Sequence, residues 1–358
     1  MSFFLAFAGF AALIILHEFG HFTAAKAVGM RVERFSLFFP PLIARKQVGE
    51  TEYAIGAVPF GGYVKISGMN PDEELPDEVR TRAYFSQPVW KRIVVISAGP
   101  AMNLVLAFLL LLVFFWQIGP ERVGDKIGTI QRGFPAVGKL HADDRLVSVD
   151  GRRGDPEQLS RAIARHRCAG PPKNGCTATS TATVVVSRDG YIVRLRLKPQ
   201  YDGQAKRTRL GFGFAPDGRE PFGFSEALRV TKDRFWYITK QTASLPARLF
   251  NSRKRKEITG TVGAYEVTRQ TILNDLGAVV GILAIISLSL AIVNLFPFLP
   301  LDGGHIFWAI VEKVRRRPVP YSVMERAGAL GFALVIGLFI IGLTNDIDRL
   351  SGQGFNVR

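Results

Sequence analysis

Histidine and cysteine are scarce in this chain of 358 residues, which contains five histidines and two cysteines. Both residue types are common zinc ligands, so few combinations of residues can hold such an ion. The cysteines, Cys168 and Cys176, lie in a polar loop without histidines at a spacing typical of a metal site. The sequence therefore restricts a metal site to histidines and carboxylates elsewhere in the chain.

The N-terminal segment lacks charge and is almost wholly apolar from Phe3 to Ile15. The absence of a basic residue before this run, at Met1 to Phe4, argues against a secretory signal peptide. The run also leaves no polar face, which argues against a soluble amphipathic helix. We therefore expect this segment to span a membrane.

The motif His17-Glu18-Phe19-Gly20-His21 follows directly. On a helix, H-E-x-x-H places two imidazoles on one face, one turn apart, with the glutamate beside them. This pattern is typical of a zinc site that has its own general base. Ionisable side chains inside a membrane segment are costly and are usually functional. We predict that His17 and His21 bind zinc and that Glu18 is the catalytic base.

A catalytic zinc site needs a third protein ligand and one open position. Asp302 is the best candidate, because it follows the apolar run Leu276–Val293 at membrane depth. The prolines between them break the helix and favour a non-helical cavity wall, and Gly303 and Gly304 permit a close backbone approach. A helix N-cap is the structural alternative for Asp302, and His305 is the next candidate ligand.

Two motifs resemble those of the site-2 protease family of intramembrane zinc metalloproteases: His17 to His21 in a first membrane helix, and Asn294…Pro297…Leu301-Asp302-Gly303 in a later one. Gly61–Met69 resembles the family's membrane-associated β-hairpin, and Ala98–Asn103 resembles the start of its second core helix. With a PDZ-like region between them, the resemblance covers nearly the whole chain. It is closest to bacterial regulator-of-sigma-factor proteases with one PDZ domain, although Pro300 stands one residue later than in the family pattern.

Composition agrees with a membrane protein that also carries a polar domain. Hydrophobic residues make up 47% of the chain, and the mean hydropathy is +0.16, which is high for a soluble protein but low for a bundle of membrane helices alone. Because a span needs about 20 apolar residues, we expect four spans, at about 3–28, 93–118, 276–296 and 328–343.

The net charge of +16 comes in large part from basic residues in loops that flank the expected spans. This placement argues against a nucleic-acid partner. By the positive-inside rule, the loops after the first span and between the third and fourth spans lie in the bacterial cytoplasm. Both termini and the long loop 119–275 then lie outside the cytoplasm, and the metal site lies toward the cytoplasmic side of the inner membrane.

The expected fold is an α-helical polytopic membrane protein with four transmembrane helices, a membrane-associated β-hairpin and an inserted extracytoplasmic α+β PDZ domain. Its expected divisions are a first core half at 1–118 with the hairpin loop at about 31–68, a PDZ domain at 119–215, an interfacial amphipathic helix and linker at 216–275, and a second core half at 276–358. For the amphipathic helix, a second face of the PDZ domain is the alternative.

Shorter elements can also be predicted. In the hairpin loop, Thr51 to Val58 and Tyr63 to Ile66 are predicted strands. In the PDZ-like region, Glu157 to His166 is the expected helix, and Asp189-Gly190 between two β-rich runs predicts a tight hairpin.

Candidate substrate-binding residues lie beside the predicted metal site. Gly61, Gly62 and Tyr63 belong to a strand edge that we expect to hydrogen-bond an unwound substrate, and a hairpin that only caps the site is the alternative. Asn294 or Asn103 is the candidate to help zinc stabilise the oxyanion.

Cys168 and Cys176 flank a short flexible loop in the region expected outside the cytoplasm. Such a location permits a disulfide bond between them, which we predict, with two free thiols as the alternative.

The residues together predict an intramembrane zinc endopeptidase. The resemblance implies single-pass membrane substrates, such as anti-sigma factors, that a site-1 protease has already shortened, and a PDZ domain that filters them by size. A membrane metal transporter and a non-catalytic PDZ scaffold are the alternative functions. A glutamate beside two histidines, at Glu18, argues against both.

Overall fold

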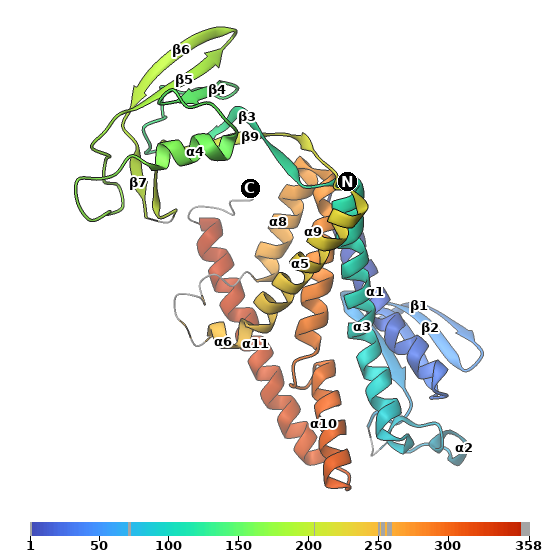
Figure 1. Cartoon of the computed structure of the whole chain (residues 1–358). Helices are drawn as coiled ribbons and strands as arrows, with labels where there is room; N and C mark the ends of the chain where they lie inside the picture. Colours follow the sequence, from blue (N-terminus) through green and yellow to red (C-terminus); the bar gives the residue numbers. More distant parts are fainter. Residues whose placement is uncertain are drawn as a thin grey trace. The chain divides into compact units, whose positions relative to one another are not determined.

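Four helices of the computed structural model are long and apolar enough to cross a membrane (Figure 1). They span Phe7–Ala27, Val89–Ile118, Gly277–Asn294 and Ser322–Ser351. The structure describes residues 2–70, 73–203, 205–249, 251, 255 and 260–351, and the four helices are those found in this part of the chain. Their number agrees with the prediction and is that of a multi-pass membrane protein.

The chain divides into two units. The membrane unit combines Met1–Ile118 with Phe222–Arg358, and the inserted unit is Gly119–Pro221. The elements of the membrane unit are, in chain order, α1 (Ser2–Ala27), β1 (Val32–Val48), β2 (Thr51–Ile66), α2 (Asp77–Arg80), η1 (Tyr84–Ser86), α3 (Val89–Val113), η2 (Phe114–Ile118), α5 (Phe224–Ala243), α6 (Leu245–Leu249), α8 (Thr261–Asn274), α9 (Leu276–Asn294), α10 (Asp302–Arg315) and α11 (Tyr321–Ser351).

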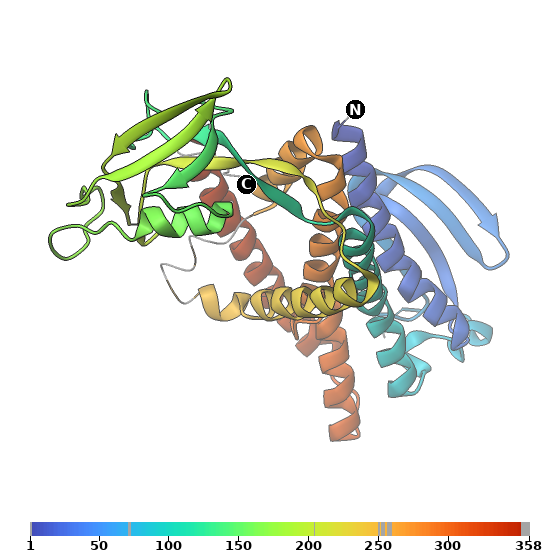
Figure 2. The same ribbon diagram turned by 45° about the horizontal axis from the view of Figure 1, so that its top comes forward.

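The core of the membrane unit begins where α1, the β-hairpin and α3 meet, and Figure 2 shows the hairpin on the outer side of α1. Its buried side chains are Ala25, Met30, Val32, Ile66, Tyr84, Val95 and Ile96. Burying these groups holds together the end of α1 that carries the H-E-x-x-H motif. The motif therefore lies on a firmly packed helix.

The hairpin has an irregular register that creates an exposed edge. Residues 34–37 of β1 pair with residues 62–65 of β2 and also with residues 52–55. This part of β1 therefore lies between two segments of β2, and residues 62–66 form an outer edge of the sheet. Both strands predicted in this loop are present, as parts of the continuous strand β2.

The helix α11 is longer than its predicted range of 328–343. Asp346 near its end is fully buried and accepts hydrogen bonds from the backbone N–H groups of Gly260 (3.1 Å) and Gly263 (2.7 Å), at the start of α8. A carboxylate at a helix N-terminus satisfies otherwise unpaired N–H groups. The helix therefore continues past the predicted span, and the carboxylate of Asp346 makes a helix–helix contact.

The segment predicted to be an interfacial amphipathic helix forms α5, which packs along the membrane-spanning helices (Figure 2). Ile238 of α5 shares an apolar cluster with Ala107 of α3 and Leu288 of α9. Because α5 belongs to the membrane unit, it does not form a second face of the inserted unit. A further helix, α8, occupies part of the predicted linker.

The inserted unit has an α+β fold, as predicted. Its elements are β3 (Glu121–Ile130), β4 (Arg145–Val149), α4 (Pro156–Ala164), β5 (Ala182–Arg188), β6 (Tyr191–Leu197), β7 (Gln200–Asp202), β8 (Arg207–Arg209) and β9 (Phe212–Arg219). Five strands form one sheet in the order β6-β5-β4-β3-β9, and β7 and β8 form a separate pair. Leu159 and Ile163 of α4 pack with Val184 and Val186 of β5 in a single apolar core.

Local signals in the inserted unit agree with the structure. Asp189 and Gly190 join β5 to β6 with positive φ angles of 51° and 85°, as a tight hairpin turn of this type requires. The helix α4 begins after Asp155, whose side chain accepts a hydrogen bond from the N–H of Gln158, and it ends two residues before the predicted His166. A disulfide joins Cys168 to Cys176.

An ion pair between Asp144 and Arg188 ties the start of β4 to the end of β5. Arg188 Nε and Nη2 lie 2.7 and 2.8 Å from the two carboxylate oxygens of Asp144, which is 1% exposed. Hydrogen bonding from the guanidinium lowers the pKa of Asp144 below its ordinary value. The pair therefore stabilises the fold above the unfolded-state pKa, and this stability is lost as the pH falls through the lower folded-state pKa.

Asp144→Asn should destabilise the inserted unit near neutral pH by roughly 3 kcal/mol, because it leaves a half-buried guanidinium without its partner. Acidification should then destabilise the variant less than the original protein. Hydrogen exchange of amides in residues 119–221, corrected for the intrinsic rate at each pH, measures both effects. Asp125→Asn, which breaks an exposed pair with Arg145, is the control and should cost less than about 1 kcal/mol. Equal acid sensitivity of Asp144→Asn and the original protein would contradict the prediction.

Candidate metal centre

The helix α1 presents His17 and His21 one turn apart on the same face, as the spacing predicts. Both residues are 6% exposed. The Nδ1 atom of His21 lies 2.9 Å from the backbone carbonyl oxygen of Val95 on α3. Because a carbonyl only accepts hydrogen bonds, His21 carries its proton on Nδ1 and leaves Nε2 free to bind a metal.

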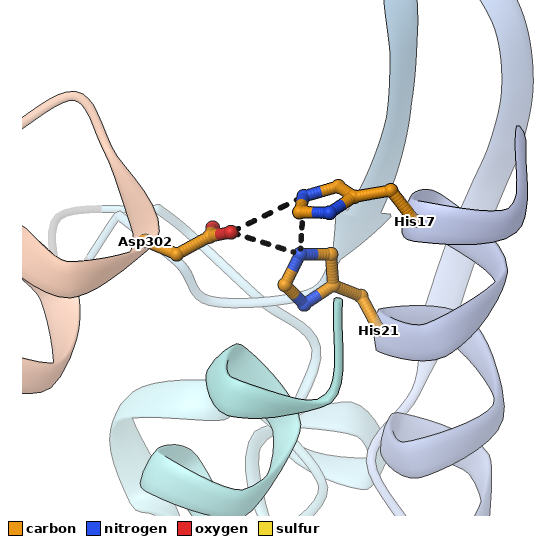
Figure 3. A group of neighbouring side chains, drawn as sticks. All are labelled: His17, His21 and Asp302. Atoms are coloured by element: carbon orange, nitrogen blue, oxygen red, sulfur yellow. Dashed lines mark hydrogen bonds and ion pairs between the residues drawn. The ribbon is translucent and has the colours of Figure 1, made fainter. Parts of the chain in front are cut away.

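Asp302 joins the two histidines from the other end of the chain (Figure 3). Its Oδ2 atom lies 3.2 Å from His17 Nε2 and 3.4 Å from His21 Nε2. Asp302 is the first residue of α10, and Leu301 stands at the N-cap position. The structure therefore directs the carboxylate to the histidines, and the alternative of a helix N-cap is not observed.

The three side chains have the spacing of zinc ligands. The two histidine Nε2 atoms lie 3.3 Å apart, so all three edges of the triangle measure 3.2–3.4 Å. A tetrahedral zinc ion with bonds of about 2.0–2.1 Å has ligand atoms about 3.3–3.4 Å apart. Asp302 Oδ2 is also buried and makes no well-directed hydrogen bond within the described part of the chain. The donor set, its geometry and this unsatisfied oxygen all fit zinc.

His305 lies one turn further along α10 and is not part of this cluster. Among the residues that the structure describes, the single group of three or more potential metal ligands is His17, His21 and Asp302, with ligand atoms within 4.8 Å of one another. Three protein ligands leave a fourth tetrahedral position open, as in catalytic zinc sites.

Close backbone approaches make this convergence possible. A Cβ atom added at Gly20 would overlap the carbonyl group of Ala98, and one added at Gly99 would overlap the imidazole of His21. At the start of α10, a Cβ at Gly303 would overlap the carbonyl of Leu295, and one at Gly304 would meet the backbone of the same loop. The two glycines beside Asp302 therefore have the packing role that the sequence suggested.

Glu18 lies between the metal ligands and the edge of the hairpin. A Cβ atom added at Gly62 would lie 3.0 Å from Glu18 Cγ, and the backbone N–H of Val64 lies against the Glu18 carboxylate. The predicted base is thus next to the two histidines in sequence and next to the edge of β2 in space.

The other predicted substrate-binding residues have different surroundings. Gly61 and Tyr63 lie on β2, where the Tyr63 hydroxyl accepts a hydrogen bond from Arg34 Nη1 at 3.0 Å. Asn294 is the last residue of α9 and is half-buried. Asn103 on α3 is fully buried, with its amide 3.2 Å from His17 Nδ1. The structure therefore brings Gly62 and Asn103 to the metal centre.

An ion pair that the sequence did not predict fixes α10 against α3. Arg92 Nη1 and Nη2 lie 3.0 and 2.6 Å from the two carboxylate oxygens of Glu312. Arg92 is 8% exposed, and its guanidinium carbon lies 5.8 Å from the ring centre of the buried Tyr84. Because α10 begins at Asp302, this pair helps to hold the third ligand in place. The two residues are far apart in sequence and belong to no motif, so no local signal identifies them.

Gly99→Ala should weaken zinc binding, because the added methyl group would overlap His21 Nε2 while α3 remains packed on α1. We expect a loss of at least about tenfold in zinc affinity, the lower range for disturbing the support of a ligand. Competition between purified protein and a chelator measures the affinity. Gly337→Ala is the matched control, because no heavy atom lies within 4 Å of a Cβ added there. Unchanged zinc affinity in Gly99→Ala would contradict the close packing of α3 against His21.

Comparison with known proteins identifies the family. Residues 5–338 match Peptidase family M50. A protein of Nostoc sp. named "Putative zinc metalloprotease" is 29% identical, over 99% of this chain and 98% of its own length. Metalloprotease MmpA of Caulobacter vibrioides is 28% identical, over 95% of this chain and 93% of its own length. The match extends over most of the sequence and includes all three candidate ligands, so this chain belongs to peptidase family M50, the site-2 protease family, and is a zinc metalloprotease of the membrane.

Proposed function

We propose that this metalloprotease hydrolyses peptide bonds within or next to the transmembrane segment of single-pass membrane proteins. The observation that carries this proposal is the ligand triangle of His17, His21 and Asp302. The two histidines lie on α1, and Asp302 follows the loop after α9; both helices are apolar enough to cross a membrane. A site at that depth reaches peptide bonds that a soluble protease cannot reach.

The catalytic roles follow from the positions of the side chains. His17, His21 and Asp302 would hold zinc, which when bound would supply Lewis-acid chemistry that polarises the scissile carbonyl and makes water more acidic. Glu18 takes a proton from the attacking water and returns it to the leaving amine. Its place beside both the histidines and the strand edge puts this proton transfer where a bound peptide would lie.

The edge of β2 is the proposed binding site for the substrate backbone. A groove of about 400 Å³ runs along Tyr63–Ile66 and is completed by Met69, Asn70 and Glu73. A transmembrane helix hides its peptide bonds in internal hydrogen bonds, so the segment to be cut must first unwind. Pairing with an exposed strand edge replaces the lost hydrogen bonds, which is the physical basis of β-augmentation. The groove along this edge therefore favours substrate binding by the hairpin over the alternative in which the hairpin only caps the site.

The inserted unit is proposed to be an extracytoplasmic PDZ domain. β9 lies at an edge of the five-stranded sheet, and PDZ domains bind extended peptides at such edges. The disulfide between Cys168 and Cys176 supports an oxidising compartment, because such bonds seldom persist in the cytoplasm. With the basic loops in the cytoplasm, we place the protein in the bacterial inner membrane with its metal centre toward the cytoplasmic side and both termini outside.

The proposed biological role is the second cut in regulated intramembrane proteolysis. A site-1 protease would first shorten the outside part of the substrate, for example an anti-sigma factor, and the PDZ domain would admit only shortened substrates. A metal transporter or a non-catalytic scaffold would not need a glutamate such as Glu18 between the metal ligands and a strand edge. Membership of a metalloprotease family also argues against both alternatives.

Glu18→Gln should lower the cleavage rate at least about a hundredfold, because it removes the general base but no metal ligand. Zinc content should stay normal in the purified variant. Asp302→Asn is the comparison variant and should lose zinc as well as activity, because a neutral amide is a poor zinc ligand. Cleavage of shortened single-pass substrates in detergent, together with elemental analysis of the protein, distinguishes the two. A Glu18→Gln variant with near-normal turnover would refute the mechanism.

Deletion of the inserted unit should preserve the chemistry, because every proposed catalytic group lies in the membrane unit. The two ends of the inserted unit lie together, since the N–H of Glu220 donates to the carbonyl of Pro120 at 3.3 Å, so a short linker can replace residues 119–221. If the unit is a size filter, the deleted enzyme should cut full-length substrates without the first protease. Loss of cleavage of shortened substrates by a folded, zinc-loaded variant would show instead that the unit delivers substrate.

A further inference from the structure

The side chain of Asn103 contacts the candidate zinc ligand His17 at Nδ1, the ring nitrogen that does not face the other ligands. Asn103 lies on α3 and is fully buried. Its Nδ2 atom lies 3.2 Å from His17 Nδ1, and its Oδ1 atom is buried without a hydrogen-bond partner among the described residues. The hydroxyl of Ser287 on α9, also fully buried, donates to the backbone carbonyl of Asn103 at 2.9 Å. The first of these contacts places the amide against the nitrogen of His17 that faces away from the ligand cluster, whereas Ser287 contacts only the backbone of Asn103.

The Nδ1 atoms of the two histidines have different hydrogen-bond partners. His21 faces a backbone carbonyl, which accepts hydrogen bonds and keeps the proton on Nδ1 whether or not zinc is bound. His17 faces an amide, which offers a donor and an acceptor of nearly the same size. With Nδ2 against Nδ1, the proton of a neutral His17 sits on Nε2, on the side of the Asp302 carboxylate 3.2 Å away.

Zinc binding requires the proton of His17 to be on the other ring nitrogen. A metal on His17 Nε2 needs the lone pair of that nitrogen, so the proton must be on Nδ1. An Nδ1–H group cannot face the Nδ2–H donor of Asn103. A half-turn of the amide brings the unpartnered Oδ1 atom to Nδ1, where it accepts the hydrogen bond, and the exchange needs little extra space because the two atoms are similar in size.

We propose that Asn103 is a positioning residue for zinc, whose amide donates to His17 Nδ1 without the metal and accepts from it when the metal is bound. This differs from the role in oxyanion stabilisation predicted from the sequence. A fully buried amide on the far side of His17 is out of reach of a substrate. The inference deepens the proposed function and rests on it for the use of the metal centre, but zinc binding can be measured without any substrate.

Three variants of the full-length protein in detergent test the proposal. Asn103→Leu keeps the approximate size but removes the acceptor, so zinc should bind about 10–100-fold more weakly, the usual effect of losing a partner of a ligating histidine. Asn103→Asp keeps an acceptor and should hold zinc within about threefold of the original protein. Ser287→Ala is the matched control, because it disturbs the same helix contact but leaves the amide in place, and its zinc affinity should be unchanged.

Competition with a chelator measures zinc affinity, and thermal unfolding of the zinc-free proteins measures the fold. Weak zinc binding by Asn103→Leu together with retention by Asn103→Asp supports the proposal. Normal zinc affinity with low turnover in Asn103→Leu would overturn it and return Asn103 to a role in transition-state binding. If Asn103→Leu does not fold, Asn103→Asp alone decides, because a tenfold or larger loss of zinc affinity in that variant also overturns it. None of these outcomes depends on the identity of the substrate.

Discussion

Three candidate ligand atoms from opposite ends of the chain must meet within about 3.4 Å of one another, among side chains that are mostly buried. His17 and His21 reach this point from α1 and Asp302 from the start of α10. An unpaired ionised group is costly in such surroundings, and so is an unsatisfied polar one. The packing of α3 between these two elements, and the broken helix that precedes Asp302, both serve this convergence.

Backbone atoms do much of the positioning. The carbonyl of Val95 sets the tautomer of His21, and glycines let α1 approach α3 and let α10 approach the loop before it. Small residues at helix contacts allow the short, rigid distances that long side chains cannot maintain. Where side chains join two helices, they form two parallel hydrogen bonds, as between the buried Arg92 and the half-buried Glu312. Ligand geometry is therefore a property of the whole membrane unit.

Local signals in the sequence predicted the three residues that converge as candidate ligands and many of the elements that carry them. H-E-x-x-H has a fixed helical spacing, a carboxylate after a broken apolar run stands out, and Asp189-Gly190 has a specific turn geometry. The sequence could not predict contacts between distant segments that follow no pattern. Asp346 lies beyond the predicted fourth span and caps α8, and the predicted amphipathic helix α5 packs on α3 and α9. In each case an amphipathic or charged segment packs against a helix that is distant in the sequence, and the local pattern does not identify that partner.

In the proposed mechanism, the place of the hairpin follows from the scarcity of water inside a membrane. A substrate helix that unwinds near the metal exposes peptide groups, and each one left unpaired costs several kcal/mol in an apolar environment. An exposed strand edge can pair with these groups only if it lies within reach of the base that completes hydrolysis. Gly62 meets this requirement, because the missing side chain lets the edge of β2 lie directly against Glu18. In the proposed mechanism, the irregular register that leaves residues 62–66 at the outside of the sheet would therefore join substrate unfolding to proton transfer in one site.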